Sequence, residues 1–215
     1  GIDLAQAGGM PIIFLTAYHV LKSRAAIQSG ETVLVHAGAS GVGTAAIQLA
    51  KQWGATVIAT ASTEEKLELA RSIGADTVIN YTSQDFVKEV KSITDGLGAD
   101  VILDCVGGDV LVKSLRTLAP YGRLVIYGNA SRSPDTSIAA GDIFPANRTV
   151  IGFSMGRSPA GTLHHRGAMI EMLPLIESGK LRLIVDHMAP MSRVADVHIH
   201  LTNRGTKGKV ILIPD

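Results

Sequence analysis

Hydrophobic residues along the 215-residue chain occur in short runs that alternate with segments of helical periodicity. Six runs are short and mostly rich in β-branched residues, which predicts strands: residues 31–37, 56–60, 76–80, 100–104, 122–128 and 149–154. Five other segments repeat apolar residues at helical spacing and predict helices: residues 11–26, 41–53, 64–73, 83–94 and 109–118. This alternation is typical of a parallel sheet with helices on both faces. We therefore predict an α/β fold built on a doubly wound, six-stranded parallel Rossmann sheet.

The pattern changes near residue 155, and a short C-terminal α/β appendage is predicted beyond it. Its expected elements are a helix over 163–178, a strand over 181–186, a helix over 192–203 and a strand over 209–213. The expected division of the chain is an N-terminal segment and helix (1–28), a dinucleotide-binding domain (29–155) and a C-terminal part (156–215). Pro11 is expected in the first turn of its helix.

Composition narrows the function classes. Hydrophobic residues make up 46% of the chain, yet no apolar run reaches the roughly 20 residues of a membrane span, which indicates strands buried on both faces. The chain has 20 basic and 19 acidic residues and only 4% aromatics, so neither a nucleic acid nor a membrane surface is expected as a partner. Cys105 is the single cysteine, which excludes an intrachain disulfide and a cysteine-rich zinc site. A cytoplasmic location is the default expectation.

Three glycines, Gly38, Gly41 and Gly43, lie between the first predicted strand and its helix. A strand that leads directly into a helix directs unpaired N–H groups and the positive end of the helix dipole at one point, where an anion fits. The G-x-G-x-x-G fingerprint is imperfect, because Ser40 stands at its second glycine. Alone, the cluster is equally compatible with a structural turn; followed by further β–α units, it predicts a dinucleotide site.

The next strand ends in Ala61-Ser62-Thr63, where an NAD-binding protein carries an acidic residue for the ribose 2′-hydroxyl. Lys66 follows one turn into the helix. Hydroxyls and a cation favour a 2′-phosphate, and one charge-assisted hydrogen bond contributes about 1.5–3 kcal/mol. NADPH is therefore the predicted cofactor, although Lys66 beside Glu64 and Glu65 is also compatible with a solvated surface charge.

No metal site is predicted. His198 and His200 are two residues apart, which places them on different faces of a helix. His36 is expected to be a packed strand histidine rather than a catalytic base, and Asp104 to cap its own turn. No arrangement of serine, histidine and aspartate indicates a nucleophile, so no catalytic residue is assigned.

Several segments resemble the zinc-independent quinone oxidoreductases, the zeta-crystallin-like branch of the medium-chain dehydrogenase/reductase superfamily. They are "HAGASGVGTAAIQLAK", "ATASTEEKLELARSIGAD", "VINYTSQDF", "VILDCVGGD" and "GRLVIYGNAS". The resemblance extends from about Leu15 to the final "GKVILIP", nearly the whole chain, and does not identify a substrate.

The resemblance implies a set of cofactor-binding positions. Toward the nicotinamide it implies Thr16, Phe153 and Ser154; at the diphosphate Ser40, Gly41, Val42 and Gly43; and around the 2′-phosphate Ser62 and Lys66. It also implies Tyr81 at the adenosine, Cys105, Val106, Gly128, Asn129 and Ala130 at the ends of the fourth and fifth strands, and Arg204 in a C-terminal loop. For Tyr81 a half-buried strand residue, and for Arg204 a surface charge, are the alternatives.

The implied activity is hydride transfer from NADPH to a quinone or an activated enone, with a small-molecule substrate. Family members also carry an N-terminal barrel-like domain, so the chain is expected to be the cofactor-binding part and to have little activity alone. Enoyl-thioester reductases and zinc alcohol dehydrogenases are the enzymatic alternatives, and a non-catalytic NADPH-binding module or inactive fragment is another. The segment "GRLVIYGNAS" is expected to form an exposed sheet edge, which predicts a homodimer or higher homo-oligomer.

Overall fold

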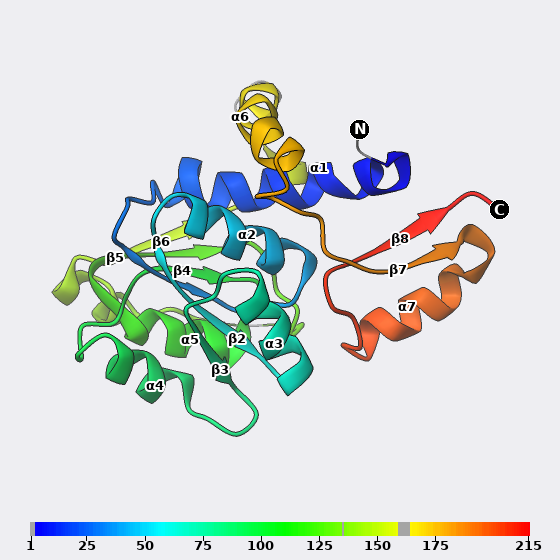
Figure 1. Cartoon of the computed structure of the whole chain (residues 1–215). Coiled ribbons are helices and arrows are strands. Elements are labelled where there is room, and N and C mark those ends of the chain that lie inside the picture. Colours follow the sequence, from blue (N-terminus) through cyan, green and yellow to red (C-terminus); the bar gives the residue numbers. More distant parts are fainter. Residues whose placement is uncertain (1–2, 135, 159–163) are drawn as a thin grey trace.

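The computed structural model describes residues 3–134, 136–158 and 164–215 (Figure 1). Its main sheet has six parallel strands in the order β3-β2-β1-β4-β5-β6. The strands are β1 (Thr32–Val35), β2 (Thr56–Ala61), β3 (Thr77–Asn80), β4 (Ala99–Asp104), β5 (Leu118–Ile126) and β6 (Thr149–Gly152). The order reverses between β1 and β4, as in doubly wound sheets. The predicted fold class is confirmed.

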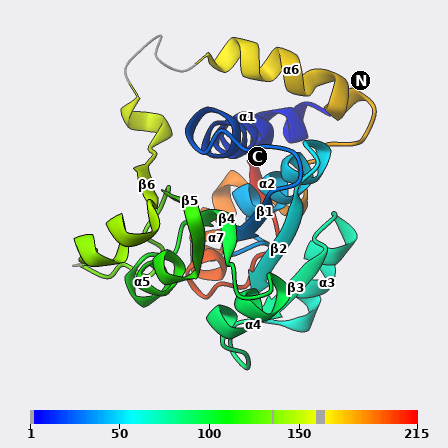
Figure 2. The same cartoon turned by 90° about the vertical axis from the view of Figure 1, so that its left-hand side faces the viewer.

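Helices cover both faces of this sheet because its strands are apolar on both sides. On β1, Val33 and Val35 point to one face and Leu34 to the other. The valine face packs against α1 (Leu4–Tyr18), α2 (Gly41–Gln52), α3 (Glu64–Ser72) and α6 (His165–Glu177). The opposite face packs against α4 (Phe86–Ile93) and α5 (Gly108–Thr117). Figure 2 shows the two layers, with α1 and α6 above the sheet and α4 below it.

The N-terminal helix begins earlier than predicted. It starts at Leu4, where the Asp3 carboxylate accepts the Gln6 N–H at 3.0 Å, so Pro11 lies inside the helix and not in its first turn. A π-helical stretch (His19–Arg24) continues it. The combined Leu4–Arg24 helix is long and apolar enough to cross a membrane by length and composition, with a mean hydropathy of 1.3, but half of that apolar window is buried. The sequence pattern had indicated no such segment.

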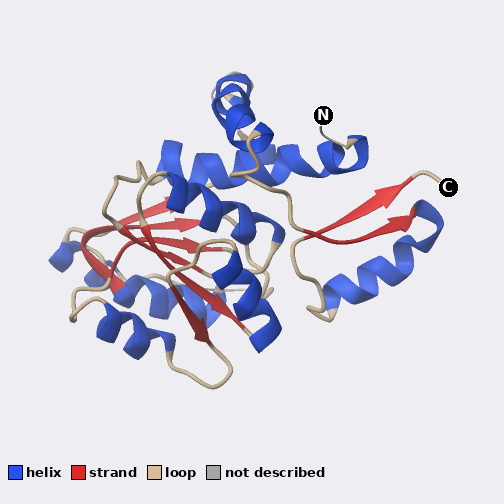
Figure 3. Cartoon of the chain, viewed as in Figure 1, coloured by secondary structure: helices blue, strands red, loops and turns tan. Residues whose placement is uncertain are grey.

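The C-terminal part contains β7 (Val185–Pro190), α7 (Val194–Thr202) and β8 (Lys209–Ile213). β7 and β8 pair in parallel as a separate sheet beside α7 (Figure 3). The strand predicted over 181–186 is therefore misplaced. The Gln48 side chain accepts the Arg182 N–H at 2.9 Å and donates to the Arg182 carbonyl at 3.0 Å, which holds this segment against α2 instead. Leu163, the predicted start of the preceding helix, lies outside the described residues.

The segment "GRLVIYGNAS" does not form an edge. β5 pairs with β4 on one side and β6 on the other, so β3 and β6 are the edge strands of the main sheet. Its apolar residues are explained by burial within the sheet, where Leu124 and Val125 are fully buried. The homo-oligomer stays a prediction without this argument for it.

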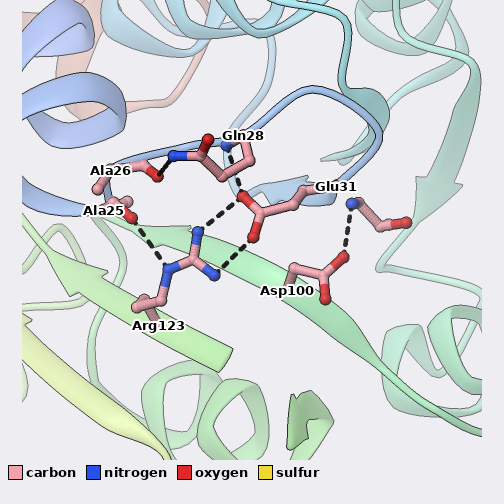
Figure 4. Close-up of polar contacts among 7 residues, drawn as sticks. Ala25, Ala26, Gln28, Glu31, Asp100 and Arg123 are labelled. Carbon is pink, nitrogen blue, oxygen red and sulfur yellow. Dashed lines mark hydrogen bonds and ion pairs between the residues drawn. The ribbon is translucent and has the colours of Figure 1, made fainter. Parts of the chain in front are cut away.

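A polar cluster fixes the amino end of the sheet (Figure 4). Arg123 of β5 donates two hydrogen bonds to the Glu31 carboxylate, both 2.7 Å long, and a third to the Ala25 carbonyl at 2.9 Å. Glu31 also accepts the Gln28 N–H at 2.8 Å, and Asp100 accepts the Thr32 N–H at the same distance. The loop that enters β1 is thereby fixed to β4 and β5, at the end of the sheet opposite the carboxyl ends of the strands.

Candidate functional site

A cavity of about 890 Å³ opens at the carboxyl ends of β1 to β4. Residues that follow four neighbouring strands line it, among them Ser40, Ser62, Tyr81 and Val106. In open α/β sheets, ligands bind outside the carboxyl ends of the strands, where the strand order reverses. The cavity therefore lies where the fold itself predicts a ligand.

The glycine turn forms one wall of this cavity. The Ser40 hydroxyl accepts the Gly43 N–H at 3.1 Å and caps α2, whose first residues are Gly41 and Val42. The first N–H groups of an α-helix have no partner within the helix and carry the positive end of its dipole. An anionic group fits this helix start.

The structure assigns separate steric roles to the turn glycines. A Cβ at Gly43 would lie 2.3 Å from the Ala37 carbonyl oxygen and 2.9 Å from that of Gly38. A Cβ at Gly41 would lie 2.9 Å from Ile13 Cδ1 and 3.4 Å from Ile13 Cγ1, both side-chain atoms, and at an ordinary 3.8 Å from the Gly208 carbonyl oxygen. Gly43 is thus required for the close approach of α2 to the turn, whereas the atoms nearest to Gly41 belong to a side chain, that of the buried Ile13.

Two cations line the cavity near the end of β2. Lys66 lies in the first turn of α3, and its amino group donates to the carbonyl oxygen of Arg204, in the loop between α7 and β8. Ser62 lies at the carboxyl end of β2, which carries no acidic residue. Lys207 is paired with Glu65, outside the cavity lining. The chain thus builds a site suited to an anion from segments 138 residues apart.

The predicted site residues fall into two groups. Those that line the cavity are Ser40, Ser62, Lys66, Tyr81, Val106, Ala130 and Arg204. Those that do not are Thr16, Gly41, Val42, Gly43, Cys105, Gly128, Asn129, Phe153 and Ser154.

Local contacts account for several positions in the second group. The Thr16 hydroxyl donates to the Ile12 carbonyl of its own helix at 2.5 Å, and the Phe153 ring lies 6.2 Å from that of His19. Asn129 bonds within its own loop, to Ser131 and Ser133. Gly41, Val42 and Gly43 are the first residues of α2 and follow the capping residue Ser40, which does line the cavity.

Cavity residues outside the predicted set include His36, Gln84, Lys113 and Thr206. His36 is 2% exposed, and its ring nitrogens lie 3.1 Å from the Thr60 hydroxyl and 2.8 Å from the Ser114 hydroxyl. Burial lowers the pKa of His36 to about 4, so the ring is neutral at pH 7. The interpretation of His36 as a packed histidine is confirmed. Lys113 comes from α5, and nothing in its local sequence marks it as a cavity residue.

The end of β4 has no activated nucleophile. The Asp104 carboxylate accepts the N–H groups of Val106 and Gly107 at 2.6 and 2.9 Å, which confirms the predicted cap. Burial raises the pKa of the adjacent Cys105 thiol, so the thiol is protonated at neutral pH. His36 lines the cavity as an uncharged side chain, whereas the protonated Cys105 lies outside the lining, so neither residue supplies a ready nucleophile or cation to a ligand there.

A reversed parallel sheet with its cavity at the carboxyl edge defines a Rossmann-type α/β protein. The sequence model of the zinc-binding dehydrogenase family matches residues 41–178, so the chain belongs to that family. The predicted resemblance to quinone oxidoreductases of the medium-chain superfamily is confirmed.

Comparison with individual proteins gives the same placement. The chain is 36% identical over 215 residues to a quinone oxidoreductase of Pseudomonas aeruginosa, covering 100% of this chain and 66% of that protein. It is 33% identical to a 2-haloacrylate reductase of Burkholderia, covering 99% and 64%. The crystal structure of Escherichia coli quinone oxidoreductase complexed with NADPH superposes with a TM-score of 0.91 at 33% identity, covering 99% and 66%. The chain thus spans just under two thirds of each relative.

Proposed function

We propose that this chain is the NADPH-binding part of an oxidoreductase that transfers a hydride to a quinone or an activated enone. The observation that carries the proposal is the cavity between the start of α2 and the end of β2, with Lys66 and Arg204 at its wall and no carboxylate at the end of β2. The names of the related proteins, quinone oxidoreductase and 2-haloacrylate reductase, support an electron-poor small-molecule substrate.

The residues present fit a dinucleotide. The N–H groups of Gly41 and Val42 at the start of α2 would hold the diphosphate. Ser62, Lys66 and Arg204 would hold the 2′-phosphate, with Tyr81 near the adenosine. When bound, NADPH supplies the hydride from C4 of its nicotinamide. The chain's own part is to bind, orient the ring and exclude water, in agreement with the uncharged His36 and Cys105 described above.

The test is a titration of the 215-residue chain with NADPH and with NADH, followed by the reduced nicotinamide fluorescence. We expect NADPH to bind about ten- to a hundred-fold more tightly, the equivalent of one charge-assisted hydrogen bond. Lys66→Gln should lose most of this preference and leave NADH affinity unchanged. Lys88→Gln is the matched control, because Lys88 is an exposed helix lysine outside the cavity lining.

Equal affinities of the unmodified chain for the two nucleotides would overturn the assignment of NADPH. Failure of both to bind folded protein would overturn the cofactor site itself. Turnover is a separate measurement. With menadione as acceptor, this chain should oxidise NADPH slowly, because more than a third of the length of each relative has no counterpart in it.

A further inference from the structure

Three side chains with metal-ligand chemistry converge in the C-terminal part of the chain. Asp186 and His187 come from β7, and His200 comes from the last turn of α7. One ligand atom from each lies within 4.8 Å of the others. The Asp186 carboxylate oxygen is 2.7 Å from His187 Nδ1 and 3.3 Å from His200 Nε2. This group is separate from the dinucleotide cavity and outside residues 41–178.

An irregularity in β7 explains how two consecutive residues reach the same point. Neighbouring side chains on a regular strand point to opposite faces. In the β7–β8 pairing, Val185 lies opposite Lys209 and His187 opposite Val210, so Asp186 is an extra residue on its strand. A β-bulge of this kind redirects a side chain. It turns the Asp186 carboxylate to the side of the sheet occupied by His187 and His200.

The surrounding backbone holds these side chains in place. The second carboxylate oxygen of Asp186 accepts the Lys207 N–H at 3.0 Å, which fixes the direction of the first. A Cβ at residue 205 would lie 2.4 Å from His200 Cε1, so the glycine there makes room for the imidazole ring. The Asp186 side chain is only 10% exposed, whereas those of His187 and His200 are 40% and 43% exposed. The group is therefore oriented from within and open to solvent on its histidine side.

We propose that Asp186, His187 and His200 form a binding site for Zn²⁺, with water as the remaining ligand. Two imidazoles and a carboxylate are ligands that Zn²⁺ takes at about 2.0–2.2 Å in tetrahedral geometry. That geometry separates ligand atoms by about 3.3 Å, the distance observed between Asp186 and His200. The distance from His187 Nδ1 to the Asp186 oxygen, now 2.7 Å, need increase by only about 0.6 Å to reach this value. The Lys207 N–H supplies the outer contact that orients a metal-bound carboxylate.

The ion would join the bulge of β7 to the end of α7. The β7–α7–β8 unit has few buried side chains, among them Ala189, Val197 and Ile211. A small unit of this kind gains stability from a structural metal, because an ion that binds only the folded form shifts the folding equilibrium. The proposed ion is thus structural, and none of its three ligands lines the proposed cofactor cavity.

The experiment uses the 215-residue chain without a polyhistidine tag, stripped of metal and titrated with Zn²⁺ near neutral pH against a chromophoric chelator of micromolar affinity. We expect uptake of one Zn²⁺ per chain and no uptake of Mg²⁺. His200→Gln and Asp186→Asn should each weaken binding at least about tenfold, because even the loss of an outer-shell partner of a metal ligand costs about 10- to 100-fold. His198→Gln is the matched control, since His198 lies on the same helix and outside the cluster, and should bind as the unmodified chain does.

Failure to take up Zn²⁺ in this competition would overturn the proposal, and so would equal binding by His200→Gln and the unmodified chain. His165→Gln tests the histidine pair on α6 and the N-terminal helix, where His19 and His165 approach to 3.2 Å; weaker binding in that variant would place the ion there instead.

A measurement on the unmodified chain avoids the risk that a variant misfolds. Zn²⁺ should slow acylation of His187 and His200 by diethyl pyrocarbonate, as located by mass spectrometry, and leave the rate at His198 unchanged. Equal protection of all three histidines, or of none, would contradict the site.

Discussion

Substitution of Gly43 by alanine tests whether the glycine turn is shaped by steric contact. The new Cβ would lie 2.3 Å from the Ala37 carbonyl oxygen and 2.9 Å from that of Gly38, both backbone atoms that no rotamer change can move. Ordinary contacts of this kind are near 3.5 Å, so the turn must shift by about 1 Å. Such overpacking costs about 1–3 kcal/mol, from which the better helix propensity of alanine removes about 0.5–1 kcal/mol.

We therefore expect Gly43→Ala to lower the free energy of unfolding by up to about 2.5 kcal/mol, or the melting temperature by up to about 10 °C. The assay is urea unfolding followed by far-ultraviolet circular dichroism and by the fluorescence of the single tryptophan, Trp53. The shifted turn should also weaken NADPH binding at least about tenfold, because it displaces the start of α2 from the proposed diphosphate position.

Gly41→Ala is the matched control within the same turn. Its closest new contact would be Ile13 Cδ1 at 2.9 Å, a side-chain atom of a buried residue rather than backbone, so the steric cost should be smaller than at Gly43 and should offset the propensity gain to within about 1 kcal/mol. If Gly43→Ala were as stable as Gly41→Ala and bound NADPH equally well, the close approach of α2 to the turn would not be what requires glycine.

Three further predictions concern stability. Burial holds the folded pKa of His36 near 4, below the usual 6.5, so on acidification the unfolded chain binds this proton before the folded chain does. The contribution of the neutral His36 to the free energy of unfolding is therefore complete above pH 6.5 and falls by about 3 kcal/mol toward pH 4. In His36→Asn the urea midpoint should change less between pH 7 and pH 5 than in the unmodified chain. A double-mutant cycle of Glu31→Gln and Arg123→Gln, measured by urea unfolding at pH 7, should give an interaction free energy between the two side chains of about 1–3 kcal/mol. Burial raises the pKa of Glu31, but the Arg123 hydrogen bonds outweigh it and lower the pKa below its usual value, so this coupling should be lost as the pH falls through the folded pKa. Gly8→Ala, in a helix position with open space around it, should raise the free energy of unfolding by about 0.5–1 kcal/mol.

The main sheet was predictable because each of its strands is a separate apolar run bounded by turn residues. The predictions failed where a distant contact overrides the local pattern. Leu181 and Arg182 belong to an apolar, strand-like segment, but the Gln48 amide on α2 takes the hydrogen bonds of Arg182. The N-terminal helix start was missed because Gly8 and Gly9 disfavour a helix locally, whereas Asp3 caps it and Gly9 lies against Leu183 and Ile211.

The site divides in the same way. The glycine turn and the neutral end of β2 are local features, and the sequence alone identified both. Lys113 could not be identified, because its place in the cavity depends on how α5 packs below the sheet. The convergence of Asp186, His187 and His200 was equally hidden, since it depends on one extra residue in β7.

The C-terminal segment completes the candidate site and is not a mere appendage to it. The Gly208 N–H donates to the Ala39 carbonyl at 2.7 Å, which fixes the start of β8 to the glycine turn itself. Gly208 has a φ of +83°, and a Cβ there would lie 2.2 Å from the Ile184 carbonyl oxygen, so this contact requires glycine. Lys66 holds the same segment at the Arg204 carbonyl. Residues 41–178, which match the family model, therefore do not form the whole cavity: the turn that ends at Ser40 lies before them, and Leu201, Arg204 and Thr206 complete the lining from the C-terminal segment.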